Sequence, residues 1–177
     1  MRYVSERKAL EQLDVLKSKF RNIIKDKYEF RAKDCANCSA ECCLDATFVN
    51  VHITKLEAIL IIKYLEEKLN EEKLEELKKR VEQTVIRYQL DSDAETSSKT
   101  FACPFFEKTI GCLIHEIKPL ACIQHACYEK REHLPPEDLQ AEFERNIEHL
   151  NEKTYGKPAT WLPLPTWIKT IMKKNKV

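Results

Sequence analysis

Eight cysteines are the residues of this sequence most able to do chemistry, and they fall into two groups. The first group has the spacing C-x2-C-x3-C-C and consists of Cys35, Cys38, Cys42 and Cys43. A C-x2-C pair lets two thiolates point into one small volume, which suits a tetrahedral zinc ion. Several thiolates from one loop also hold iron–sulfur clusters. Because adjacent side chains usually diverge, it stays open which of Cys42 and Cys43 is the ligand.

The second group is more widely spaced and consists of Cys103, Cys112, Cys122 and Cys127. It has no second C-x2-C pair, which disfavours a two-knuckle zinc ribbon. Four dispersed cysteines and one tight loop suit a larger cluster slightly better than a zinc ion. His115 and His125 lie among these cysteines at spacings that could serve a metal, although surface histidines are the simpler interpretation.

The number and clustering of the cysteines favour metal or cluster binding over two alternatives. One alternative is a set of structural disulfides. The other is a redox or peroxide-sensing thiol, for which the adjacent pair Cys42 and Cys43 is the best support. We therefore predict all eight cysteines as metal ligands. The two segments must then meet in space if they share one site.

Helices are expected to position these segments, because the chain has only two glycines, Gly111 and Gly156. Few glycines allow few of the tight turns that need positive φ, which disfavours sandwiches and barrels of short strands. Apolar residues at spacings of three and four predict an amphipathic helix over 5–30. Thr54 and Glu57 fit a capping box that starts a second helical region, either one long helix or a pair.

Further helices are expected in and after the second cysteine segment. Pro119 could open a short helix that reaches Cys127. Helices are also predicted over about 137–151 and from about Thr166.

The predicted fold class is all-α, a single-domain helical bundle in which the two cysteine-bearing loop segments converge on a metal site. The domain spans 1–177, with a metal-binding core over about 31–130 and flanking helices over 5–30 and 137–175.

The formal net charge of +1 gives no overall attraction to nucleic acid or to anionic membranes. The longest apolar stretch, Ala58 to Ile62, is too short to span a bilayer. The first ten residues do not resemble a signal peptide. We expect a cytoplasmic protein with no nucleic-acid and no membrane partner, whereas an unknown protein partner stays open.

Taken together, the motifs resemble the YkgJ-type cysteine-cluster family (CxxCxxCC), whose members are described as zinc- or iron-chelating domains. The resemblance covers roughly Cys35 to Cys127. Three residues separate Cys38 from Cys42 where the family has two. His115 and Lys118 stand where the family often has Tyr and Arg. The motifs are Cys35-Ala-Asn-Cys38, Cys42-Cys43, Cys103-Pro-Phe-Phe and Cys112-Leu-Ile-His-Glu-Ile-Lys-Pro-Leu-Ala-Cys122.

The resemblance implies a metal-binding protein that holds an iron–sulfur cluster or zinc. Flagellin lysine methylases carry a similar motif and look like iron–sulfur proteins, which favours [4Fe–4S] slightly. The implied role is electron transfer, metal handling or service as an accessory to a modifying enzyme. One alternative is an iron–sulfur-dependent protein-modifying enzyme such as a lysine N-methylase, although no glycine-rich cofactor loop is present. Another is a structural, zinc-stapled interaction domain. Whether the protein is an enzyme stays open.

Overall fold

A computed structural model of the chain describes residues 3–33, 41–44, 46, 49–91, 98–108, 110–125, 127–128 and 130–174. Most of these residues lie in α-helices, and the strands form short antiparallel pairs. The predicted all-α class is therefore confirmed. No described helix is long and apolar enough to cross a membrane. The division into a core and flanking helices stays a prediction.

The first helix, α1, spans Glu6–Lys27 and matches the predicted amphipathic segment. Ser5 caps its N-terminus, because the Ser5 hydroxyl accepts a 3.5 Å hydrogen bond from the backbone N–H of Lys8. The buried side of this helix follows the helical period. Its buried residues are Ala9, Leu10, Leu13, Lys17, Phe20 and Ile24.

The second helical region is a pair of helices, α3 over Lys55–Lys68 and α4 over Glu71–Arg87. The predicted capping box is confirmed at the start of α3. Thr54 accepts from the backbone N–H of Glu57, and the Glu57 carboxylate accepts from the backbone N–H of Thr54 at 3.1 Å. Asn70 separates the helices, because its side chain accepts a 2.9 Å hydrogen bond from the first turn of α4.

Three helices lie in the C-terminal part of the chain. The prediction of a helix that reaches Cys127 is wrong in extent, since α5 ends earlier and Cys127 lies in a strand. The helix α6 ends at Gly156, whose φ of +69° is the left-handed conformation that glycine adopts readily at a helix C-terminus. The bounds are Leu120–Gln124 for α5, Glu137–Tyr155 for α6 and Leu164–Lys174 for α7.

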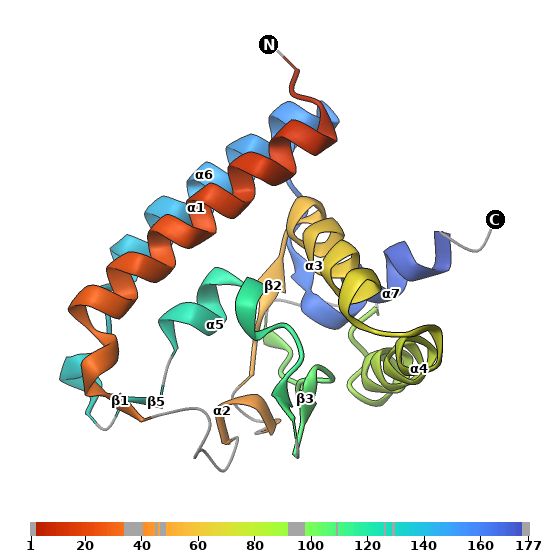
Figure 1. The fold of residues 1–177 in the computed structure, drawn as a ribbon, viewed down its shortest axis with the longest axis horizontal. Coiled ribbons are helices and arrows are strands. Elements are labelled where there is room, and N and C mark those ends of the chain that lie inside the picture. The colour runs from red at the N-terminus through yellow and green to blue at the C-terminus, as the bar shows by residue number, and fades with distance from the viewer. Residues whose placement is uncertain are drawn as a thin grey trace.

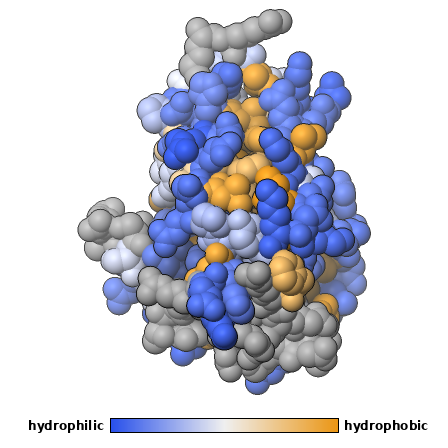
Figure 2. All heavy atoms as spheres, turned by 90° about the vertical axis from the view of Figure 1, so that its left-hand side faces the viewer, coloured by the Kyte–Doolittle hydropathy of each residue, from blue (hydrophilic) through white to orange (hydrophobic). Residues whose placement is uncertain are grey.

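The helices form two groups that share α3 (Figure 1), and each group packs around its own apolar cluster. One cluster lies between α3, α4 and α7, and the other between α1, α3, α5 and α6. The helix α3 contributes Leu56 to the second cluster and Ile61 and Leu65 to the first. On the outer face formed by α1 and α6, charged side chains border a narrow strip of apolar ones (Figure 2).

Among the described residues, two-residue strands form three antiparallel pairs, of which β1–β5 and β2–β6 tie distant segments together and β3–β4 is a local hairpin. The pair β2–β6 joins the segment before α3 to the segment before α7, while β1–β5 and β3–β4 carry cysteines. A four-residue helix, α2, spans Glu41–Leu44 and contains Cys42 and Cys43. The strands are β1 Ala32–Lys33, β2 His52–Ile53, β3 Phe106–Glu107, β4 Gly111–Cys112, β5 Cys127–Tyr128 and β6 Leu162–Pro163.

Candidate metal centre

The two cysteine segments meet through their main chains. The backbone N–H of Cys103 donates a 2.7 Å hydrogen bond to the carbonyl oxygen of Cys43. A second link is the β1–β5 pair, in which Lys33 lies opposite Cys127. The elements α2, β1, β3 and β5 occupy the same end of the molecule (Figure 1). The two segments therefore meet, as the sequence predicts.

A Cys-Pro-Phe turn at Cys103 leads into the β3–β4 hairpin. The backbone amide of Phe105 forms a hydrogen bond to the Cys103 sulfur, and the Phe105 ring is fully buried. Gly111 has a φ of +92° where β4 begins, a conformation that favours glycine. The hairpin thereby places Cys112 so that it packs, like Cys103, against the cluster between α3, α4 and α7.

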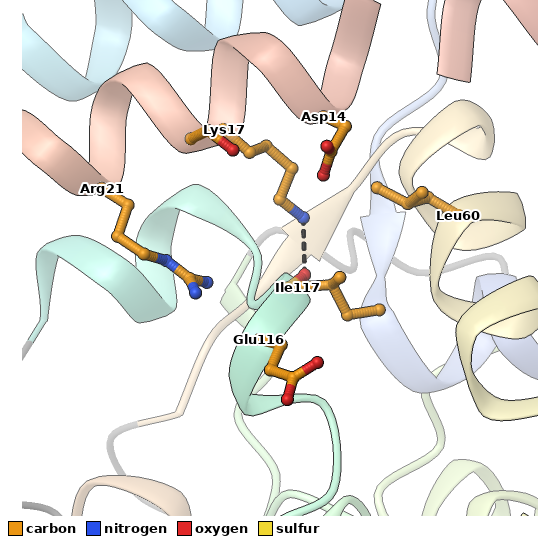
Figure 3. Close-up of a pocket in the computed structure, with 7 residues that line it drawn as sticks. Asp14, Lys17, Arg21, Leu60, Glu116 and Ile117 are labelled. Carbon is orange, nitrogen blue, oxygen red and sulfur yellow. Dashed lines mark hydrogen bonds between the residues drawn. The ribbon is translucent and has the colours of Figure 1, made fainter. Parts of the chain in front are cut away.

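The helix α1 fixes the stretch that precedes Cys122, the third residue of α5. Lys17 extends from α1 and donates a 2.6 Å hydrogen bond from Nζ to the carbonyl oxygen of Ile117 (Figure 3). One turn further along α1, Arg21 donates a 3.1 Å hydrogen bond to the carbonyl oxygen of His115. Two long basic side chains thus hold the main chain that connects β4 to α5.

Lys17 is a buried ammonium group, since the residue is only 4% exposed. Burial lowers the pKa of Lys17, while the Glu57 carboxylate and the thiol of Cys122 raise it. Glu57 is equally buried; burial raises the pKa of its carboxyl group, and Lys17 lowers it. The hollow beside Lys17 measures about 30 Å³, room for about one water molecule. Its lining consists of Asp14, Lys17, Ser18, Arg21, Leu60, Glu116 and Ile117.

The Cys103 thiol is affected electrostatically by two other cysteines of the second segment. Burial raises the pKa of the Cys103 thiol, and the neighbouring thiols of Cys122 and Cys112 raise it further. The Phe105 amide and the Arg80 guanidinium act in the opposite direction. A metal binds the thiolate, so a bound cation would take the place of the proton that burial otherwise retains.

The structure places four of the eight predicted ligands with their side chains. Cys35 and Cys38 lie outside the described residues, and only the backbone of Cys42 and Cys127 is described. Among the side chains that the structure describes, no three Cys, His, Asp or Glu form a group close enough to hold a metal ion. The complete ligand set therefore stays a prediction. The four half-buried thiols are Cys43, Cys103, Cys112 and Cys122.

The two candidate histidines are both exposed. His115 lies in the 3-10 helix His115–Ile117, and His125 follows the last turn of α5, where its backbone N–H donates to the carbonyl of Ala121. Partial desolvation of the ring, with Lys118 and Arg21 nearby, lowers the pKa of His115. A lower pKa favours the neutral imidazole, which is the form that can bind a metal. Ligation by either histidine stays a prediction.

Sequence reasoning missed two charged residues beside the thiols. The sequence pattern could have indicated Lys17, because this residue occupies a position of the apolar stripe between Leu13 and Phe20, where a lysine is unusual. No sequence pattern indicated Arg80, since an arginine on a helix rich in Lys and Glu is most simply exposed to solvent.

Residues 34–148 match the model of the CxxCxxCC family, described as "Putative zinc- or iron-chelating domain". The chain belongs to this family. The CxxCxxCC match covers both cysteine segments, the helices α3 to α5 and most of α6. No curated protein and no solved structure is detectably similar to the chain.

The described residues of this CxxCxxCC protein fit zinc or iron by their chemistry. Sulfur is a donor that both metals accept, and the three thiols around Cys103 come from a turn, a strand and a helix that converge. The amide of Phe105 aimed at the Cys103 sulfur stabilises a thiolate there. Cys103, Cys112 and Cys122 are the candidate ligands from the second segment; in the structure they do not lie close enough together to hold a metal ion as a group, and the backbone carbonyl of Cys43 ties the first segment to Cys103.

Proposed function

We propose that this CxxCxxCC protein binds iron or zinc through thiolates of both cysteine segments, with an iron–sulfur cluster as the favoured occupant. The hydrogen bond between Cys103 and Cys43 carries the proposal, since it brings the second segment against the first. A metal held at this junction would draw sulfur ligands from parts of the chain that no single loop could supply.

Two features support the cluster over a single zinc ion. A mononuclear zinc site takes four ligands, often from C-x2-C knuckles, whereas the thiols around Cys103 come singly from separate elements. The sulfur of Cys103 also accepts an amide hydrogen bond, and such bonds help to set the reduction potential of iron–sulfur clusters. The role that follows is one-electron transfer or metal handling, alone or as an accessory to a modifying enzyme.

The alternative of a lysine N-methylase needs a pocket for a cofactor and a substrate. The hollow beside Lys17 has room for about one water molecule and is too small to be that pocket, which ordinarily measures several hundred Å³. A binding titration with S-adenosylmethionine would test this alternative directly.

Metal analysis of protein purified without oxygen, combined with its visible spectrum, tests the proposed function. A brown protein that contains iron and acid-labile sulfide would support the cluster. A colourless protein that retains zinc after dialysis would support the thiolate site but replace the cluster by a zinc ion. A protein that holds neither metal, with its cysteines paired as disulfides, would overturn the proposal.

A further inference from the structure

Arg80 is anchored to the β3–β4 hairpin, which follows Cys103 and carries Cys112. It extends from α4, and its terminal NH2 donates a 3.0 Å hydrogen bond to the carboxylate of Glu107 on β3. In the β3–β4 pair, Glu107 lies opposite Gly111, the residue before Cys112. The guanidinium group is thereby fixed beside the hairpin and only about one third exposed.

The Nε–H group of Arg80 is a donor that the ion pair with Glu107 does not use. The Nε atom of Arg80 is inaccessible to water, and within the described part of the chain it has no hydrogen-bond partner. A buried donor without an acceptor is destabilising, so such an atom calls for an explanation. Because Arg80 is positioned by Glu107 through its other end, the Nε–H bond is held in place and available to an acceptor.

The sulfur of Cys103 is a candidate acceptor for this donor. Cys103 packs against the same apolar cluster as Leu77 and Val81, which flank Arg80 on α4. The Arg80 guanidinium is one of the groups that oppose the rise in the pKa of the Cys103 thiol, so it lies within electrostatic reach of the sulfur. A neutral thiol is a weak acceptor, whereas a thiolate bound to a metal accepts N–H bonds well.

Resting on the proposed function, we propose that Arg80 donates a hydrogen bond from Nε to the metal-bound thiolate of Cys103. Arg80 is then a positioning residue of the metal centre. Its ion pair with Glu107 sets the direction of the Nε–H bond, and the metal supplies the charge that turns Cys103 into an acceptor. Groups that orient metal ligands in this way commonly change metal affinity by about 10- to 100-fold when they are removed.

Three variants separate the hydrogen bond from the ion pair: Arg80→Met, Arg80→Lys and Glu107→Gln. Arg80→Met removes the charge and Nε, and Arg80→Lys keeps a charge without Nε. Glu107→Gln removes the negative charge of the ion pair but keeps Nε and a side-chain oxygen that can still accept the hydrogen bond that anchors Arg80. Competition with a chelator for Zn²⁺ or Co²⁺ measures affinity. We expect Arg80→Met to weaken binding by about 10- to 100-fold and Arg80→Lys to weaken it as well. Glu107→Gln should bind as tightly as the native chain or more tightly, because it removes a negative charge near the thiolates.

A spectroscopic signature distinguishes hydrogen bonding from a structural effect. In the Co²⁺-loaded protein, loss of an N–H bond to sulfur shifts the thiolate-to-metal charge-transfer band, and we expect this shift in both Arg80 variants but not in Glu107→Gln. If the protein holds an iron–sulfur cluster, Arg80→Met should also lower its reduction potential, since the donor favours the added electron. Lys173→Met is the matched control, because Lys173 pairs with Glu82 of α4 through an exposed salt bridge at 3.2 Å.

The outcomes keep the two proposals apart. If the native protein binds no metal, the proposed function itself fails. If the native protein binds metal and Arg80→Met binds it equally well, only the role of Arg80 is overturned. Equal weakening by Arg80→Met and Glu107→Gln, without a shift of the charge-transfer band, would assign the effect to the ion pair and also overturn the hydrogen bond.

Discussion

The rings of Phe20 in α1 and Phe143 in α6 lie with centroids 5.0 Å apart and planes inclined by 55°. Both side chains are buried in the cluster between α1, α3, α5 and α6. Tilted aromatic pairs of this kind add about 0.5–1.5 kcal/mol beyond the burial of their surface. The contact joins the first long helix to the last long one without involving a cysteine.

This packing leads to a prediction for the metal-free protein. Chelation should leave the helical signal in far-ultraviolet circular dichroism nearly unchanged, because buried apolar residues from α1, α3, α4, α6 and α7 hold the helices together. The melting temperature should fall by about 5–10 °C if free metal stood near one hundred times its Kd. A chain that loses its helices on chelation, as zinc fingers do, would contradict this expectation.

Removing one thiol tests whether both segments serve one centre. Cys103→Ser keeps the backbone N–H that binds the Cys43 carbonyl but removes the sulfur. We expect most of the bound metal to be lost, because serine oxygen is a poor ligand for zinc or iron next to thiolates. Elemental analysis measures the loss. Ala102→Ser adds a hydroxyl at the neighbouring position and should retain the metal; equal metal content in both variants would exclude Cys103 as a ligand.

Lys17 and Glu57 form a buried, oppositely charged couple that a double-mutant cycle can measure. Lys17→Met leaves the Ile117 carbonyl without its donor and the Glu57 carboxylate without its cation, so a loss of about 1–3 kcal/mol in the free energy of unfolding is expected. Glu57→Gln together with Lys17→Met should cost less than the sum of the single changes. Urea denaturation gives these values, and strict additivity would show that the two groups do not interact.

The raised pKa of Glu57 makes the stability of the folded chain depend on pH in a predictable direction. Burial raises the pKa in the folded chain, so the folded state retains the Glu57 proton more strongly than the unfolded state does. The contribution of this proton to the free energy of unfolding is complete at pH values below the pKa that Glu57 has in the unfolded chain. This contribution is lost as the pH rises through the pKa that Glu57 has in the folded chain. Relative to Glu57→Gln, the native chain should therefore lose stability as the pH rises above the ordinary range of a carboxyl group. Urea denaturation of both proteins in the same metal state measures their free energies of unfolding. If the prediction is wrong, the difference between the two free energies will not change with pH.

Gly156 combines a left-handed backbone with a close neighbour. Its φ is +69°, and a Cβ placed there would lie 2.9 Å from the Tyr3 ring. Gly156→Ala should cost about 1–2 kcal/mol from the backbone alone, measured by thermal unfolding. Tyr3→Ala in the same chain should relieve only the contact with the ring. If Gly156→Ala alone has native stability, the conformation at the end of α6 does not require glycine.

The sequence predicts the parts of this fold that depend on neighbouring residues. Thr54 and Glu57 are three positions apart, so a capping box is visible in the chain itself. The sequence did not decide whether the helix is interrupted at Asn70, because a polar residue in a Lys- and Glu-rich stretch fits either a continued helix or a helix cap.

Pairings between distant residues were not accessible in the same way. A strand of two residues has no period, so nothing in the chain indicates that Lys33 pairs with Cys127. The meeting of the cysteine segments followed from chemistry, while the contact of Cys43 with Cys103 came only from the fold. Arg80 became a candidate through its buried Nε, an observation that requires coordinates.

The long-range pairing of Lys33 with Cys127 has a consequence for the order of events on the ribosome. Cys43 leaves the ribosome more than eighty residues before Cys127. At about 5–20 residues per second, that interval lasts roughly 4–17 seconds. During that time the thiols of the first segment lack the strand and hairpin that complete their surroundings. If the predicted ligand set is right, metal delivered to the nascent chain in this interval would meet only half of the predicted ligands, and stable loading would follow translation of the second segment.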